Sequence, residues 1–271
     1  MIQLNHLPLD GGPEAILQGW QRDIDDIPTY SDRVALAKSC FSARNKPGNA
    51  TFTHVKAVLT RMCQGARRCA YCEDSVADEV EHIQPKDLYP EFVFTWTNYL
   101  YACGPCNGPK NSGFAVITGD PLQLVDVTRA RGVPVVPPLA GDSALINPRV
   151  EDPLHFLFLD LLNTFAFTPR DTEDVSETDR IRAGYTIRVL RLNARDYLVD
   201  ARRTAFGTYR ARLREYIEEK REGATQAQLD RRRNELLKVG HRTVWREMQR
   251  QHANYQPLAT LFADASEALA W

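Results

Sequence analysis

Two cysteine pairs constrain this chain more than any other feature of its sequence. Cys69 and Cys72 form one C-x-x-C pair, Cys103 and Cys106 form a second, and 30 residues separate the pairs. Each pair directs two sulfurs to the same place, so together they can supply four thiolates to one tetrahedral zinc ion. Such a site is closed to water, which predicts a structural zinc that joins two distant segments and contributes to folding. The alternative, four separate buried thiols in a core, is disfavoured by the paired spacing.

The first residues and the composition favour a soluble, cytoplasmic protein without a membrane segment. The opening stretch, MIQLNHLPLDGGPEAI, lacks the basic and apolar regions of a signal peptide. No stretch approaches the roughly 18 uninterrupted apolar residues of a membrane helix. Without an export signal, paired cysteines favour zinc over disulfides. The 34 Lys and Arg nearly balance the 35 Asp and Glu, for a net charge of −1. Any nucleic-acid binding must therefore come from a local basic face.

The sequence divides into three regions, which we expect to form a mostly helical α+β protein. Residues 1–65 form an N-terminal helical region. Its patterns run from Pro13 towards Ile24, from a capping Ser31 to Phe41, and onward from Asn49, where apolar residues recur at helical spacing. Residues 66–148 hold the cysteines and then short segments at 122–127 and 133–136, which favour strands or extended loop.

Residues 149–271 form a C-terminal helical region. A long helical pattern follows Asn193 and reaches about Lys220, and Gly223 interrupts it. Thr225 and Gln228 then have the spacing of a capping box for the next helix. Two interpretations of the arginines in this region remain: a solvated helix face, or a surface that binds phosphates or an acidic partner.

Polar residues suited to metal-assisted chemistry lie between and beside the cysteine pairs. Residues 80–83 and 99–102 alternate like strands. If these strands pair antiparallel, the loop between them holds Asn98, and a helical turn from Cys106 returns across the hairpin. Glu81 and Asn107 can then converge on one cation, with His82 beside them. Carboxylate and amide oxygens are hard ligands that suit Mg²⁺ or Mn²⁺.

The segment 68–114 resembles the HNH endonuclease motif on a ββα-metal finger braced by a four-cysteine zinc. The resemblance rests on the patterns C-x-Y-C-E, E-H-x-x-P-K, W-x-N and C-x-x-C-N-x-x-K. It is strongest for the HNH proteins of Septu-type and some retron-associated antiphage defence systems, which are found beside ATPases. It is strong over about 69–114 and weaker over roughly 1–215. The resemblance implies a small ββα-metal core embedded between the two helical regions.

The resemblance also implies roles for four residues. His82 falls at the position of the general base, which takes a proton from the attacking water. Glu81 and Asn107 fall at the two metal-ligand positions, and Asn98 at the position that ties down the loop. The glycines and proline that follow Asn107 predict a short finger helix. Lys86 and Lys110 have two possible roles, as contacts to phosphate or as solvated charges.

The implied activity is metal-dependent hydrolysis of phosphodiester bonds, most simply in DNA, with a 5′-phosphate and a 3′-hydroxyl in the products. An ATPase partner in a bacterial antiphage defence system is implied as well. Two alternatives stay open. In the first, the substrate is RNA, such as tRNA, which the motif allows because it neither requires nor excludes a 2′-hydroxyl. Otherwise, the protein is a zinc-braced module that binds nucleic acid or a partner without cutting.

Overall fold

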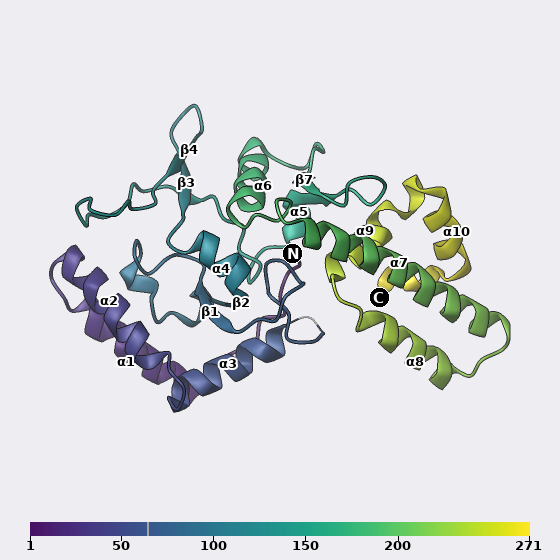
Figure 1. Ribbon diagram of the computed structural model, residues 1–271, viewed down its shortest axis with the longest axis horizontal. Helices are drawn as coiled ribbons and strands as arrows, with labels where there is room; N and C mark the ends of the chain where they lie inside the picture. Colours follow the sequence, from purple (N-terminus) through teal and green to yellow (C-terminus); the bar gives the residue numbers. More distant parts are fainter. Residues whose placement is uncertain (64) are drawn as a thin grey trace.

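The computed structural model describes residues 1–63 and 65–271. Gln64, which the first predicted region includes, lies outside the described residues. The N-terminal helices lie at one end of an elongated molecule, the helices of residues 196–264 lie at the other, and a hairpin with its short helix lies between them (Figure 1). The described strands form small sheets of two or three strands, and most of the regular structure is helical. The expected α+β, mostly helical class is confirmed.

Three helices form the N-terminal region: α1 (Gly11–Asp25), α2 (Tyr30–Arg44) and α3 (Ala50–Met62). The third helix begins next to Asn49, as expected, and Asn49 caps it, because its Oδ1 accepts a hydrogen bond from Phe52 N at 3.0 Å. The predicted cap of α2 was wrong. Thr29 holds that position, since its extended backbone lets its hydroxyl accept from Asp32 N, whereas Ser31 already lies within the first turn.

The central hairpin consists of β1 (Glu79–His82) and β2 (Tyr99–Ala102), and the short helix α4 (Gly104–Lys110) follows it. The strands pair antiparallel, with His82 opposite Tyr99, so the predicted hairpin is confirmed. Helices α2 and α3 cover one face of it with aromatic rings. The Phe41 ring lies 4.4 Å from the His82 ring, and the Phe52 ring lies 6.2 Å from Tyr99. The loop between the strands contains two turns of 3-10 helix, Pro90–Phe92 and Trp96–Asn98.

The segment after α4 forms a second small sheet, ordered β4-β3-β5, from β3 (Ala115–Thr118), β4 (Gln123–Asp126) and β5 (Asp142–Ser143). The expected strand within 122–127 is therefore present as β4. Residues 133–136 form extended loop, the other of the two expected outcomes. This segment is rich in proline, which has no N–H group to donate to a neighbouring strand.

The C-terminal region is mainly helical. It consists of α5 (Pro153–Phe156), the hairpin β6 (Leu157–Leu159) and β7 (Phe167–Pro169), α6 (Glu177–Val189), α7 (Asp196–Arg221), α8 (Gln226–Leu237), α9 (Arg242–Gln251), α10 (Gln256–Asp264), and the 3-10 turns His252–Asn254 and Ser266–Ala270. The long helix expected after Asn193 is α7, and the chain turns at Gly223, where φ is +82°. The capping box of α8 is confirmed, because Thr225 N donates to Gln228 Oε1 at 2.8 Å. Within the described residues, no helix combines the length and apolar character needed to cross a membrane.

Several arginines of the long helix are already engaged inside the protein. Arg202 is 1% exposed and donates to the backbone oxygens of Phe165 and Leu192. Arg203 and Arg212 form ion pairs with carboxylates of their own helix. Arg202 is thus part of the interior, and the charges of Arg203 and Arg212 are each paired with a carboxylate.

Candidate functional site

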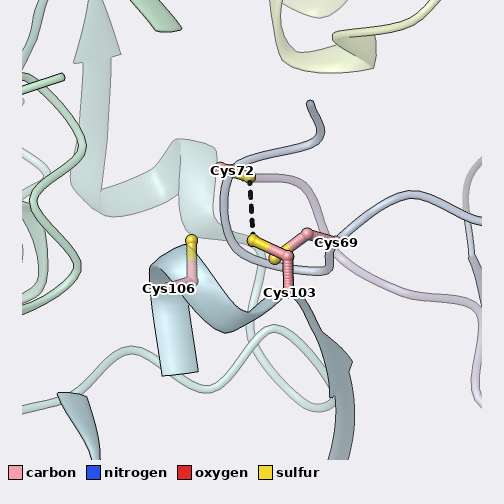
Figure 2. A group of neighbouring side chains, drawn as sticks. All are labelled: Cys69, Cys72, Cys103 and Cys106. Atoms are coloured by element: carbon pink, nitrogen blue, oxygen red, sulfur yellow. Dashed lines mark hydrogen bonds between the residues drawn. The ribbon is translucent and has the colours of Figure 1, made fainter. Parts of the chain in front are cut away.

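The four cysteines of the two pairs meet at one point (Figure 2). Cys69 and Cys72 lie in a tight turn that Glu73 N closes on the carbonyl of Cys69 at 2.9 Å. Cys103 precedes α4, and Cys106 lies in its first turn. All four are buried, and none forms a disulfide.

The sulfur positions fit a tetrahedral zinc site. Zn–S bonds of about 2.3 Å place neighbouring sulfurs about 3.8 Å apart. The Sγ atoms of Cys72 and Cys103 are 3.8 Å apart, and all four Sγ atoms lie within 4.8 Å of one another. Arg195 Nη2 lies 3.2 Å from Cys106 Sγ, where its charge offsets part of the excess negative charge of four thiolates around a divalent ion. These residues could therefore hold a structural zinc.

Glu81 lies on the face of β1 that α4 covers. Its side chain is 5% exposed and forms an ion pair with the ammonium group of Lys110. Burial raises the pKa of Glu81, and the charge of Lys110 opposes that rise. An acid at this depth needs a cation beside it to stay ionised.

Lys110 is itself buried, with a side chain that is 0% exposed. Its Nζ also donates to the backbone oxygen of His82 at 2.8 Å. A phosphate contact from Lys110 does not fit this position, because its ammonium group is enclosed and already has two partners. Neither of the two sequence alternatives for Lys110, a phosphate contact or a solvated charge, fits this position: Lys110 is an internal counter-charge to Glu81.

His82 lies on the opposite face of β1, against the rings of Phe41 and Tyr99. Its Nε2 lies 2.9 Å from the carbonyl oxygen of Val93. A carbonyl can only accept, so Nε2 carries the proton and Nδ1 keeps a free lone pair. Burial, together with the charges of Lys86 and Lys110, lowers the pKa of His82 to about 3. The imidazole is therefore neutral at physiological pH, with Nδ1 unprotonated.

Asn98 ties the loop of the hairpin to the end of β1. Its Oδ1 accepts from Gln84 N at 2.8 Å, and its Nδ2 donates to the backbone oxygens of Gln84 and Phe92, each at 3.0 Å. Phe92 immediately precedes Val93, whose carbonyl holds the imidazole. Asn98 is thus placed to fix His82 through the backbone.

Asn107 lies in the middle of α4. Its Nδ2 donates to Glu79 Oε2 at 2.6 Å, and no described residue forms a hydrogen bond with its Oδ1. The helix is short, as expected, because the chain turns sharply after Lys110. At Gly113 a Cβ atom would lie 2.7 Å from the carbonyl oxygen of Lys110, so only glycine fits this turn without displacing the backbone.

One cavity of about 180 Å³ brings these side chains together. Glu81, His82 and Asn107 all line it, and so does Lys86, whose side chain is only partly buried. Lys38 of α2 lines it too and forms a 2.7 Å ion pair with Asp87. Asn98 does not line the cavity and acts behind it.

Sequence reasoning did not identify Lys38, Phe41 or the role of Glu79. Lys38 and Phe41 come from a helix about 40 residues away, and no local pattern predicts that this helix covers the hairpin. Glu79 carried a usable signal, because it lies two positions before Glu81 on a strand and so shares its face.

A buried arginine connects the hairpin to the segment before α5. Arg149 is 3% exposed and donates to the backbone oxygens of Trp96 and Tyr99 at 3.1 and 2.8 Å. The same segment is held against α6, because Arg182 forms two hydrogen bonds with Glu151 at 2.6 and 2.7 Å. The hairpin and its loop are therefore anchored to the C-terminal region.

The chain is similar to the Septu protein PtuB of Bacillus thuringiensis, with 41% identity over 64 residues. This stretch is 22% of the present chain and 24% of that protein, so the chain matches less than a quarter of the relative's length. No protein-family model and no solved structure matches the chain.

Proposed function

We propose that this protein is a metal-dependent HNH endonuclease, built on a zinc-braced ββα finger, that hydrolyses phosphodiester bonds in nucleic acid. The observation that carries the proposal is the cavity on which Glu81, His82 and Asn107 converge. A carboxylate, a neutral imidazole with a free nitrogen and an amide oxygen are the groups that metal-assisted hydrolysis of a phosphodiester requires.

In this proposal, His82 is the general base. Its Nε2 proton is committed to the Val93 carbonyl, so Nδ1 accepts the proton of the water that attacks phosphorus. The hydrogen bonds of Asn98 fix the backbone on both sides of this contact. The base is thus oriented before substrate arrives, which reduces the entropy lost on reaching the transition state.

The divalent ion would be Mg²⁺ or Mn²⁺, held by Glu81 and Asn107. The donor set fits such an ion, because both residues offer hard oxygen atoms at the same cavity and Asn107 Oδ1 has no hydrogen bond to a described residue. The ion would supply positive charge to the phosphate and to the leaving 3′ oxygen. Lys86 is the candidate for direct contact with a phosphate oxygen.

The decisive experiment compares wild type with His82→Ala. The matched control is His54→Ala, which changes a partly exposed histidine of α3 outside the cavity. We expect His82→Ala to lose at least about a hundredfold in cleavage rate, the usual contribution of a general base. Zinc content and circular dichroism should stay at wild-type values. Cleavage at the wild-type rate by His82→Ala would refute the assignment.

We propose DNA as the substrate and an ATPase of an antiphage defence system as the partner, as the resemblance of segment 68–114 implies. The similarity to the Septu protein PtuB supports the defence role. A net charge of −1 gives the isolated chain little general affinity for a polyanion, so a partner that binds nucleic acid would help. Duplex DNA, single-stranded DNA and tRNA, each tested with and without the co-expressed ATPase, would identify the substrate. Cutting of tRNA alone would replace DNA by RNA, and Mg²⁺-independent binding without cutting would favour a binding module.

A further inference from the structure

A second cavity, of about 460 Å³, lies in the C-terminal region. None of its lining residues belongs to the cavity of Glu81 and His82. It lies between α5, the end of β7 and α9, and three arginines line it: Arg170, Arg246 and Arg250.

Two of these arginines are held in place by the protein. Arg250 donates to the backbone oxygens of Leu154 and Leu157 and pairs with the buried Glu247, so its position is set by three elements. Arg170 donates to the backbone oxygen of His155 and pairs with Asp174 at 3.0 Å. Asp174 is largely exposed, so water weakens this pair.

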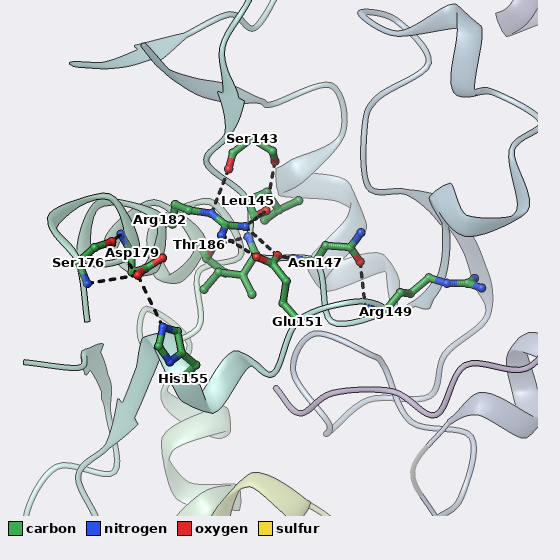
Figure 3. Close-up of polar contacts among 11 residues, drawn as sticks. Ser143, Leu145, Asn147, Arg149, Glu151, His155, Ser176, Asp179, Arg182 and Thr186 are labelled. Carbon is green, nitrogen blue, oxygen red and sulfur yellow. Dashed lines mark hydrogen bonds and ion pairs between the residues drawn. The ribbon is translucent and has the colours of Figure 1, made fainter. Parts of the chain in front are cut away.

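Arg246 differs from the other two. Its side chain is exposed, and it forms no hydrogen bond or ion pair with any residue in 1–63 or 65–271. The carboxylate that lines the cavity belongs to Asp152, and its Oδ1 already accepts from Leu154 N at 3.0 Å as the cap of α5. His155, at the rim, is turned towards Asp179 at 3.6 Å (Figure 3). The lining thus carries three guanidinium groups and one carboxylate, and one of the cations has no counter-ion in the part of the chain that the structure describes.

This lining favours an anion with several oxygen atoms. The planar guanidinium group matches the geometry of phosphate and can bind it through two parallel hydrogen bonds. The volume lies within the range of about 300–1,000 Å³ that is common for small-molecule sites. Leu154 and Leu269 add an apolar part to the lining, which a phosphate ion alone would leave uncovered.

We propose that this cavity binds a nucleoside phosphate, with its phosphate on Arg170 and Arg246 and its base against Leu154 and Leu269. The ligand is either a free nucleotide or the terminal nucleotide of a nucleic-acid strand, because both present the same chemical groups. The site is independent of the proposed nuclease chemistry.

Isothermal titration calorimetry would test the proposal with AMP, ADP and inorganic phosphate on wild-type protein. A 5′-phosphorylated oligonucleotide, titrated into His82→Ala, tests the strand end without cleavage. We expect AMP or ADP to bind more tightly than phosphate if the ligand is free, and the phosphorylated oligonucleotide to bind more tightly than its dephosphorylated form if the ligand is a strand end.

The informative variant is Arg246→Ala, since this exposed side chain has no hydrogen-bond or ion-pair partner to lose among the described residues. We expect it to weaken binding about tenfold, and Arg246→Lys to weaken it less, because lysine keeps the charge without the planar fork. The matched control is Arg214→Ala, an exposed arginine of α7 outside the cavity, which should bind as wild type does. Absence of binding by all probes at millimolar concentration would overturn the proposal, as would equal affinity of Arg246→Ala and wild type.

Discussion

Replacing Lys110 with methionine tests the electrostatics of the site most directly. Methionine keeps much of the unbranched stem, so the change removes the ammonium group and leaves only a small cavity. The Glu81 carboxylate, 5% exposed, then loses the cation that faces it. The backbone oxygen of His82 loses a hydrogen bond of 2.8 Å as well.

The expected cost follows from the burial of both partners. Removing one member of a buried ion pair costs about 3–5 kcal/mol, because the remaining charge is left uncompensated away from water. We expect the free energy of unfolding of Lys110→Met to fall by that amount at neutral pH. An exposed pair would contribute less than about 1 kcal/mol, so the burial decides the magnitude.

Urea denaturation, followed by far-UV circular dichroism on zinc-loaded protein, would measure the change. The set includes Glu81→Gln and the double variant Glu81→Gln/Lys110→Met, which has neither charge. The double variant should recover at least about 2 kcal/mol relative to Lys110→Met, since no carboxylate is then left unpaired. The control is Lys46→Met, an exposed lysine without an ion pair among the described residues, which should stay within about 0.5 kcal/mol of wild type.

Two results would refute this reasoning. A loss below about 1 kcal/mol in Lys110→Met would mean that the ammonium group does not compensate a buried charge. A double variant no more stable than Lys110→Met would mean that the cost comes from packing and not from Glu81.

Three further predictions concern the elements around the site. Zinc can be removed with a chelator or by replacing Cys106 with serine. Either change should abolish stoichiometric zinc in atomic absorption and lower the unfolding temperature, since zinc binding contributes on the order of 10 kcal/mol to folding. An unchanged melting curve without zinc would contradict this. Asn98→Ala should lower the free energy of unfolding by about 2–4 kcal/mol in urea denaturation, because three hydrogen bonds are lost. It should also speed amide hydrogen exchange at Gln84. Unchanged exchange would show that the loop is fixed by other contacts. Gly113→Ala should lower the free energy of unfolding by about 1–3 kcal/mol in thermal unfolding, because the new Cβ meets the Lys110 carbonyl. Gly108→Ala, with open space at its Cβ, should raise it by up to about 1 kcal/mol. Equal effects of the two changes would contradict the steric argument.

Local patterns predicted much of the hairpin and its surroundings. The expected antiparallel hairpin is present, and the structure adds that Glu81 and His82 lie on opposite faces of β1, with Glu81 against Lys110 and His82 against Phe41. Both residues still line one cavity, because they lie at the end of the strand, where the loop and α4 come together. The helix after the hairpin begins at Gly104, two residues before the expected start at Cys106.

The part that could not be predicted depends on residues far apart in the chain. Lys110 and Lys38 are both lysines near the site, yet Lys110 is enclosed and Lys38 is more than half exposed, at 55%. Nothing in their sequence neighbourhoods separates the two. The difference arises because α4 packs across β1, while Lys38 lies on the rim of the cavity.

The sequence by itself determined the cysteine pairs, the hairpin and the starts of α3 and α8, because turns, strand alternation and caps depend on residues only a few positions apart. The tertiary structure alone decided which charges are buried, which helix covers His82 and where the arginine-lined cavity opens. These properties depend on how distant segments pack and exclude water, and the energy of a charged group depends on that exclusion more than on its neighbours in the chain.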